Sequence, residues 1–234
     1  MVRARRCSQR LPPGEWLAFV ARTDWATSAH RWTHFAQKDQ LCAHSTWTVT
    51  RDPFNRGSSL DMTTRLLLIA DTHLPKRAKD LPAVVWAAVD DAYLVLHAGD
   101  WVDVAALDAL EARATRLVAV VGNNDHGMLR ERLPEFATMT VEGLRLGVVH
   151  ETGQATGRES RCDAAYPDLD VLVFGHSHIP WDTTTPRGLR LLNPGSPTDR
   201  RRQPFCTYMT AVVEDGELAS VDLHQIARPT GGQA

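Results

Sequence analysis

Five short groups of polar residues follow apolar runs in this chain, and each contains side chains that can bind a metal ion or move a proton. The apolar runs read as buried strands, and open α/β sheets place their functional residues just past the ends of such strands. Aspartate, asparagine and histidine offer oxygen and imidazole ligands, and no group contains a cysteine, so the set suits hard to borderline divalent metals. In chain order the groups are Asp71-Thr72-His73, His97-Ala98-Gly99-Asp100, Gly122-Asn123-Asn124-Asp125, His150-Glu151 and Gly175-His176-Ser177-His178.

Taken singly, most of these groups have an ordinary structural explanation. An aspartate after a strand often caps a helix, a Gly-Asp pair often forms a turn, and His150 alone would read as a half-buried strand residue. The pair His176 and His178 is more specific, because residues two apart in extended backbone point to the same side and adjacent imidazoles need a reason to be there. The same spacing would let Asp71 and His73 converge on one ion.

The joint occurrence of the groups decides the interpretation, because together they supply enough ligands for two metal ions that share one carboxylate. Two ions held about 3.5–4 Å apart polarise a water to hydroxide and stabilise the attacking and leaving oxygens of a phosphoryl displacement. The candidate metal ligands are Asp71, His73, Asp100, Asn123, His150, His176 and His178.

Short apolar runs alternate with helical stretches from Met62 onward, and this pattern predicts a domain of β/α layers. The pairs Glu142-Gly143 and Asp215-Gly216 are expected to form turns between paired strands. Residues 62–234 are therefore expected to form one domain that carries all five groups. Strands are expected at 65–70, 93–97, 117–121, 136–141, 144–150, 171–174, 189–192, 208–213 and 217–225, and helices at 81–90, 102–112 and 159–165.

Residues 1–61 differ in composition from the rest of the chain. They hold nine lysines and arginines against five acidic residues, although the whole chain carries a formal net charge of −2. Four of the seven tryptophans lie here, but no hydrophobic period of 2 or 3.6 persists, so the segment reads as unstructured. We expect Met62 to be the biological start and the segment to be an extension read from a misplaced start. The alternative is a disordered tail that binds a partner.

Composition disfavours several classes of protein. A net charge of −2 creates no general attraction to nucleic acid or to an anionic membrane, so no stable nucleic-acid complex is expected. No segment approaches the roughly 18 uninterrupted apolar residues of a membrane span, and the apolar run at 17–21 is too short for a signal peptide. The four cysteines lack the spacing of a zinc site or a disulfide framework, so we expect a cytoplasmic protein.

The order D-x-H, G-D, G-N-x-D, H and G-H-x-H resembles the calcineurin-like metallophosphoesterase superfamily. The stretch GHSHIP followed by LLNPGSP looks like its YfcE-type phosphodiesterase branch, and the resemblance covers about residues 65–225. It implies an α/β fold, namely a β-sandwich of two mixed sheets flanked by helices in four α/β/β/α layers. It also implies that Asp125 orients a neighbouring ligand and that Asp100 and Asn123 act directly in catalysis. One metal would be held by Asp71, His73, Asp100 and His178, and the other by Asp100, Asn123, His150 and His176, with Asp100 bridging.

Departures from the family pattern narrow the expected reaction. Many members carry G-N-H-[DE], whose histidine is thought to protonate the leaving group, whereas Asn124 cannot act as an acid near neutral pH. Residues 99–105 lack the Arg-Gly of the G-D-x-x-D-R-G motif found in protein Ser/Thr phosphatases and dinucleoside tetraphosphatases. The family histidine at His150 is usually followed by glycine, whereas Glu151 follows it here. Hydrolysis of monoesters with poor leaving groups is therefore disfavoured.

Five further features allow two interpretations each. His97 is either a packed or supporting residue or a ligand, and His126 either replaces the missing acid or lies in solvent. Trp101 either stacks on a nucleobase or fills the core. The stretch 193–196 either presents N–H groups to a phosphate or forms a plain turn, and the arginines at 200–202 either screen an anionic substrate or are simply solvated.

We therefore expect a metal-dependent phosphodiesterase in which a hydroxide bridging two divalent ions attacks a small phosphodiester, for which a nucleotide is one candidate. Manganese is the expected metal, with iron, nickel or zinc as alternatives because these ligand types do not select among them. The alternative functions are a phosphomonoesterase and a non-catalytic interaction scaffold on the same fold, as in the retromer scaffold subunit, whose metal ligands are eroded. All the ligand positions are intact here, which favours the enzyme, and a homo-oligomer is compatible with the sequence.

Overall fold

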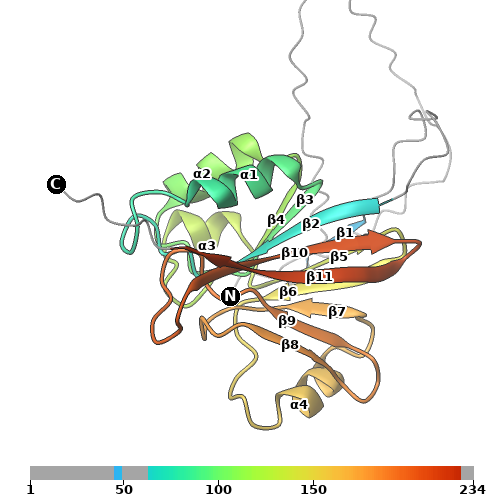
Figure 1. Cartoon of the computed structure of the whole chain (residues 1–234). Coiled ribbons are helices and arrows are strands. Elements are labelled where there is room, and N and C mark those ends of the chain that lie inside the picture. Colours follow the sequence, from blue (N-terminus) through green and yellow to red (C-terminus); the bar gives the residue numbers. More distant parts are fainter. Residues whose placement is uncertain (1–44, 49–62, 228–234) are drawn as a thin grey trace, which may run out of the picture. The chain divides into compact units, whose positions relative to one another are not determined.

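Two mixed β-sheets pack face to face in the computed structural model, which describes residues 45–48 and 63–227 (Figure 1). One sheet has five strands in the order β11-β10-β2-β3-β4, and the other has six in the order β1-β5-β6-β7-β9-β8. Among the described residues, no helix is long and apolar enough to cross a lipid bilayer.

In the five-stranded sheet, β2, β3 and β4 run parallel, and β10 and β11 extend it antiparallel beyond β2. Every residue of β3 and the last four of β2 are buried, as expected for parallel strands covered on both faces. The parallel strands end at the same edge, which is where the first three polar groups follow them. The strands are β2 Thr63–Ile69, β3 Leu94–His97, β4 Leu117–Ala119, β10 Cys206–Glu214 and β11 Glu217–Ile226.

In the six-stranded sheet, β6, β7 and β9 run parallel, whereas β5 and β8 pair antiparallel with β6 and β9. The strand β1 pairs parallel with β5 at the edge of this sheet. The last two polar groups follow β6 and β7. The strands are β1 Ser45–Thr48, β5 Phe136–Val141, β6 Leu144–Val149, β7 Val171–Val173, β8 Trp181–Thr184 and β9 Arg190–Asn193.

Helices cover the outer face of each sheet. The helices α1, α2 and α3 pack on the five-stranded sheet, where Val85, Leu107 and Leu129 join one cluster with strand residues such as Leu67. The helix α4 packs on the six-stranded sheet through Cys162. Figure 1 shows the two helical layers on opposite sides of the sheets, so the expected α/β/β/α arrangement is confirmed. The helices are α1 Ala83–Asp91, α2 Val104–Arg113, α3 Met128–Arg132 and α4 Arg158–Ala165.

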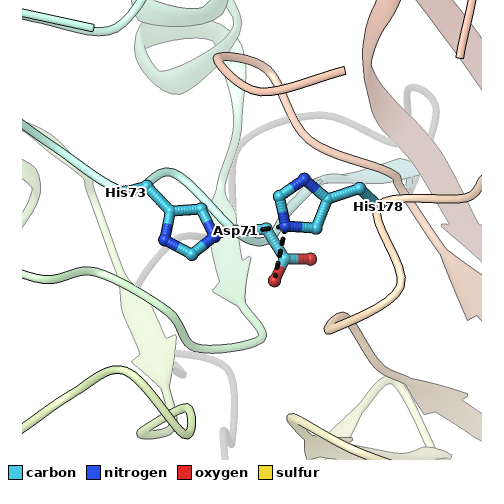
Figure 2. Close-up of side chains that lie close together, drawn as sticks. All are labelled: Asp71, His73 and His178. Atoms are coloured by element: carbon cyan, nitrogen blue, oxygen red, sulfur yellow. Dashed lines mark hydrogen bonds and ion pairs between the residues drawn. The ribbon is translucent and has the colours of Figure 1, made fainter. Parts of the chain in front are cut away.

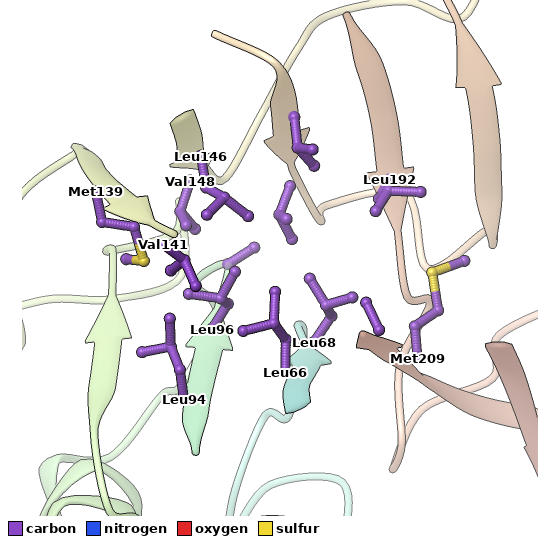
Figure 3. Packing of buried hydrophobic residues seen from close by; sticks show 14 of the residues in the cluster. Leu66, Leu68, Leu94, Leu96, Met139, Val141, Leu146, Val148, Leu192 and Met209 are labelled. Carbon is purple, nitrogen blue, oxygen red and sulfur yellow. The ribbon is translucent and has the colours of Figure 1, made fainter. Parts of the chain in front are cut away.

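The core between the sheets is formed by alternate residues of the strands. Leu66 and Leu68 of β2 point into this core, whereas Leu67 and Ile69 point to the helices, because successive side chains of a strand face opposite ways. Figure 3 shows the side chains of the two sheets meeting. The labelled residues of this core are Leu66, Leu68, Leu94, Leu96, Met139, Val141, Leu146, Val148, Leu192 and Met209.

Three elements were not expected from the sequence. The helix α3 has five residues and β8 has four, so both are too short for a clear hydrophobic period. The strand β1 lies within residues 1–61, so the expectation of an unstructured segment is wrong for Ser45–Thr48. Its partner β5 is about ninety residues away, and local periodicity carries no signal of such distant pairing. The rest of the segment lies outside the described residues, and the boundary at Met62 stays a prediction.

A chain that begins at Met62 is expected to melt at a lower temperature than one that begins at Leu41 and keeps β1. Removing β1 leaves Ala137–Thr140 of β5 without their pairing partners, and each kcal/mol lost lowers the midpoint by about 2–4 °C in a domain of this size. Thermal unfolding of the two chains measures the effect, and both chains keep every candidate ligand, since all of them follow Met62. Equal midpoints would contradict the pairing and would support the interpretation based on the sequence.

Candidate metal centre

The five polar groups meet at one edge of the sandwich, because β2, β3, β4, β6 and β7 all end there. Backbone hydrogen bonds tie the connecting loops together: Asp71 N donates to Gly99 O, and His73 N donates to Asp100 O, both at 2.9 Å. Gly175 N donates to His150 O at 3.0 Å, which joins the last two groups. All seven side chains proposed from the sequence lie in one connected cluster, through the contacts given below.

Asp71, His73 and His178 form the first half of this cluster (Figure 2). Nε2 of His178 lies 3.1 Å from Nε2 of His73 and 3.5 Å from Oδ1 of Asp71. Nδ1 of His178 donates to the carbonyl oxygen of Asp199 at 2.6 Å, so the neutral ring carries its proton on Nδ1. The lone pair on Nε2 therefore points into the centre, which is the tautomer that a metal requires.

His150, Asn123 and His176 form the second half. Nε2 of His150 and Nδ1 of His176 each lie 2.9 Å from Oδ1 of Asn123. Nδ1 of His150 donates to Ala98 O at 2.7 Å, so Nε2 again carries a lone pair directed at the centre. His150 is buried, whereas Asn123 is exposed and His176 is partly exposed, so this half opens to solvent.

The carboxylate of Asp100 lies between the two halves. Its Oδ2 is 3.5 Å from Nε2 of His73, and its Oδ1 is 3.4 Å from Nε2 of His150. Asn124 holds the carboxylate in place, because its backbone N donates to Oδ1 at 2.9 Å and its side-chain amide donates to Oδ2 at 2.6 Å. Each oxygen of one carboxylate thus faces a histidine of a different half.

The backbone at the ligands is left-handed and not extended, which corrects the expected strand-like geometry of the His176–His178 and Asp71–His73 pairs. Strands β2 and β7 end before these pairs, and each side chain reaches the centre from a turning loop. The φ angles lie between 44° and 69° at Asp71, His73, Asp100, His176 and His178.

Glycines allow the loops to approach this closely. A Cβ on Gly122 would collide with Oδ1 and the backbone N of Asp100, and a Cβ on Gly175 would lie 2.9 Å from Oδ2 of Asp71. Gly99 has φ +84°, a conformation that favours glycine, and a Cβ there would lie 2.7 Å from Gly122 N. The close packing of these backbones fixes the position of both carboxylates.

Asp125 supports the loop that carries Asp100, in agreement with the orienting role implied by the family resemblance. Its Oδ1 accepts from the backbone N of Trp101 and Val102 at 2.8 Å. Its Oδ2 accepts from Asp100 N at 3.0 Å and from Gly122 N at 2.7 Å. One fully buried carboxylate therefore satisfies four backbone donors around the candidate ligand.

The structure resolves the alternatives for His97 and Trp101. Trp101 is fully buried, stacks on His97 with ring centroids 3.4 Å apart, and donates its indole N–H to Val120 O. Trp101 therefore fills the core and cannot stack on a substrate. His97 is also fully buried and contacts Oγ1 of Thr72 at 3.1 Å, so it is a packed residue.

The stretch 193–196 supports the metal-facing loops. Oγ of Ser196 donates to the carbonyl oxygen of Asp71 at 2.7 Å, and Nδ2 of Asn193 donates to that of Gly175 at 2.8 Å. The backbone N of Gly195 bonds to Asn193 Oδ1 and is not offered to a phosphate. His126 is exposed in the turn after Asp125.

Burial sets the protonation of the centre. It lowers the pKa of His73 and His150, and it lowers that of His178 to about 4, so these rings are neutral at pH 7 with a free lone pair. Burial, together with the charge of Asp100, raises the pKa of Asp71 well above its usual range. Although burial opposes ionisation of Asp100, the neighbouring His150 and the hydrogen bonds from Asn124 lower its pKa.

These residues fit divalent metal ions. Oδ2 of Asp71 is buried without a hydrogen-bond partner, and a buried carboxylate oxygen needs a cation or a donor. Ligand atoms of Asp71, His73 and His178 lie within 4.8 Å of one another, and so do those of Asp71, Asp100 and His150. Converging lone pairs and carboxylates repel one another, and a cation at the centre removes that repulsion.

Comparison with known proteins identifies the family. Residues 64–216 match the calcineurin-like phosphoesterase superfamily domain. A probable metallophosphoesterase of Methanothermobacter thermautotrophicus is 37% identical over 166 residues, which cover 69% of this chain and 92% of that protein. The family match and the candidate ligand groups together support a metal-dependent phosphoesterase.

Solved structures share the fold. The Thermotoga maritima protein TM1076 superposes with a TM-score of 0.57 at 30% identity, covering 70% of this chain and 99% of that protein. Vps29 of Entamoeba histolytica, solved with zinc, gives a TM-score of 0.57 at 23% identity, covering 70% of this chain and 98% of Vps29. The resemblance read from the sequence is confirmed, and the chain belongs to the calcineurin-like phosphoesterase superfamily.

Proposed function

We propose that this chain is a phosphodiesterase whose two divalent metal ions share the carboxylate of Asp100. The observation that carries the proposal is the position of that carboxylate, since Oδ2 faces His73 and Oδ1 faces His150. The first ion would be held by Asp71, His73, Asp100 and His178, and the second by Asp100, Asn123, His150 and His176.

The two ions, when bound, would supply a hydroxide nucleophile and stabilise the charge that develops on the phosphoryl oxygens. The chain's own residues prepare the site for this chemistry. His150 and His178 each anchor Nδ1–H on a carbonyl oxygen and keep Nε2 free to bind. Asn123 and His176 form the solvent-facing side, so substrate would enter there.

The side chain of Asn124 favours a diester over a monoester as substrate. Its amide donates to Oδ2 of Asp100 and has no proton that it can transfer near neutral pH. The alcohol must therefore leave as its anion, without a proton from residue 124. Diesters of acidic alcohols react most readily in this way. The proposed metal is manganese, and the proposed location is the cytoplasm.

A non-catalytic scaffold is the second candidate, since Vps29 shares the fold. The buried and unpartnered Oδ2 of Asp71 argues against it, because a scaffold gains nothing from burying a carboxylate oxygen without a partner. Manganese-dependent hydrolysis distinguishes the two functions, because Vps29 of Entamoeba histolytica was itself solved with zinc and bound metal alone fits both. Diester hydrolysis by a protein that holds about two ions per chain supports the enzyme, whereas a folded protein without manganese-dependent hydrolysis supports the scaffold, whatever its metal content.

The manganese-loaded protein is expected to cleave bis(4-nitrophenyl) phosphate faster than 4-nitrophenyl phosphate. In Asn124→His the rate on phenyl phosphate, a monoester with a poorer leaving group, should rise relative to the rate on 4-nitrophenyl phosphate, because an imidazole can protonate the leaving oxygen. The measurement is kcat/KM for the three esters in the wild type and in the variant.

The matched control for this comparison is His126→Asn, which removes the exposed imidazole of the same loop. It should leave all three rates unchanged, since His126 is not needed as an acid in the proposed reaction. A wild type that prefers the monoester, or a control that loses activity on diesters, would contradict the proposal.

A further inference from the structure

The loop between β9 and β10 contacts the loops that carry the candidate metal ligands at several points, and three of them involve the ligand residues Asp71, His178 and His176. Ser196 Oγ donates to Asp71 O at 2.7 Å, and Asp199 O accepts from Nδ1 of His178 at 2.6 Å. The guanidinium of Arg201 lies within 3.4 Å of the carbonyl oxygen of His176. The first two contacts hold candidate ligands in place, whereas the third places a positive charge beside the solvent-facing half of the centre.

Arg201 has no carboxylate partner among residues 63–227. The nearest acidic residue in its loop, Asp199, pairs with Arg77 through Oδ2 and Nε at 3.1 Å. Arg201 is exposed, and its φ of +48° turns the chain at this point.

A pocket of about 440 Å³ opens beside Arg201. Arg201 and Asp199 line it, and both also contact candidate ligands, through Asp199 O to His178 and through the Arg201 guanidinium to His176 O. Much of its remaining lining is apolar, from Pro82, Phe205 and Ile226. Phe205 is 41% exposed and presents an aromatic ring in the pocket.

We propose that this loop forms a substrate subsite, in which Arg201 binds a phosphoryl oxygen and the Phe205 pocket receives a planar aromatic ester group. The proposal deepens and rests on the phosphodiesterase function, because it names the class of substrate as an aryl or nucleoside ester. A guanidinium without a carboxylate partner matches the negative charge that a phosphodiester retains. An aromatic ester group can stack on Phe205 and bury its apolar surface there, whereas a methyl group has much less apolar surface to bury. The volume suits a group of nucleoside size.

Binding of two non-hydrolysable anions tests the two parts of the subsite. Phenylphosphonate and methylphosphonate carry the same phosphonate group, and only the first has an aromatic ring. Their dissociation constants are measured by calorimetry on the manganese-loaded wild type and on Arg201→Gln, Phe205→Ala and Arg202→Gln. Arg202 is the matched control, because it is exposed, lies in the same loop and does not line the pocket.

Arg201→Gln is expected to raise both dissociation constants about tenfold, the effect of one charge-assisted hydrogen bond. Phe205→Ala is expected to raise that of phenylphosphonate roughly fivefold and to leave methylphosphonate unchanged. Arg202→Gln should change neither dissociation constant by more than about twofold, because an exposed charge outside the pocket interacts weakly with the anion.

Equal effects of Arg201→Gln and Arg202→Gln would overturn the role of Arg201. A Phe205→Ala effect that is absent, or equal for the two anions, would overturn the aromatic pocket.

Kinetics separate a failure of this inference from a failure of the proposed function. With bis(4-nitrophenyl) phosphate, Arg201→Gln should raise KM about tenfold and leave kcat nearly unchanged, because it removes binding shared by substrate and transition state. A wild type that hydrolyses no diester contradicts the phosphodiesterase, and phosphonate binding then still decides the subsite. A wild type that hydrolyses diesters with unchanged KM in Arg201→Gln contradicts the subsite alone.

Discussion

Asp100→Asn is expected to lower manganese-dependent diester hydrolysis by at least about a thousandfold, or about 4 kcal/mol of transition-state stabilisation. The amide cannot supply negative charge to two ions at once, although it has the same shape and tolerates φ +62°. In the wild type, metal should raise the melting temperature, since binding at 100 times Kd adds about 2.7 kcal/mol. Most of that shift should disappear in the variant. Metal content, melting temperature with and without manganese, and turnover give three separate readouts.

Asp215→Asn is the matched control for this substitution. Asp215 also has a positive φ, of +51°, and lies exposed in the β10–β11 turn, remote in sequence from every candidate ligand. The substitution Asp215→Asn removes one carboxylate charge at a residue with a similar positive φ, and the variant should keep full activity. An Asp100→Asn protein that is folded and retains more than about a tenth of wild-type turnover, a loss of only about 1.4 kcal/mol, would contradict a shared carboxylate.

Gly122→Ala is expected to abolish metal binding and to lower hydrolysis by at least about a hundredfold. The added Cβ would lie 2.8 Å from Asp100 Cγ, and it would also meet Oδ1 and the backbone N, which cannot rotate away. Overpacking of this kind costs about 1–3 kcal/mol and forces the backbone to shift. Metal content and activity of the purified variant measure the effect.

Gly127→Ala provides the comparison in the same loop. A Cβ there meets no heavy atom within 4 Å, although φ +55° makes alanine less favourable by about 1–2 kcal/mol. It should lose some stability and keep its metal. If the Gly122→Ala and Gly127→Ala proteins have equal metal content, the close approach of Gly122 to Asp100 does not position the carboxylate.

The sequence predicted those parts of the fold that depend on local patterns. Buried strands such as β2 and β3 are apolar runs bounded by polar residues. The sequence therefore predicted both the strands and the polar groups that follow them. The convergence of the groups followed from the parallel arrangement, because the carboxyl ends of parallel strands share an edge. The strand β1 was missed because its pairing with β5 is a distant contact.

Other parts of the site could not be predicted, because they depend on backbone atoms that every residue has. The carbonyl oxygens of Ala98 and Asp199 set the tautomers of His150 and His178, and no side-chain type marks such a carbonyl. The position of Arg201 was equally hard to predict. The three adjacent arginines at 200–202 allowed either contact with an anionic substrate or simple solvation, and only the folded backbone places one of them beside His176.

The left-handed backbone at five candidate ligands lowers the free energy of unfolding, although the same side chains form the centre. The five residues are Asp71, His73, Asp100, His176 and His178. Each non-glycine residue in that conformation costs about 1–2 kcal/mol, and less for aspartate than for histidine, whereas glycine adopts it freely. Glycine at any of these positions would relax the backbone and remove a ligand at the same time. Selection for heat resistance alone would therefore favour chains that have lost the centre, and a thermostable variant that still works must gain its stability elsewhere in the two sheets.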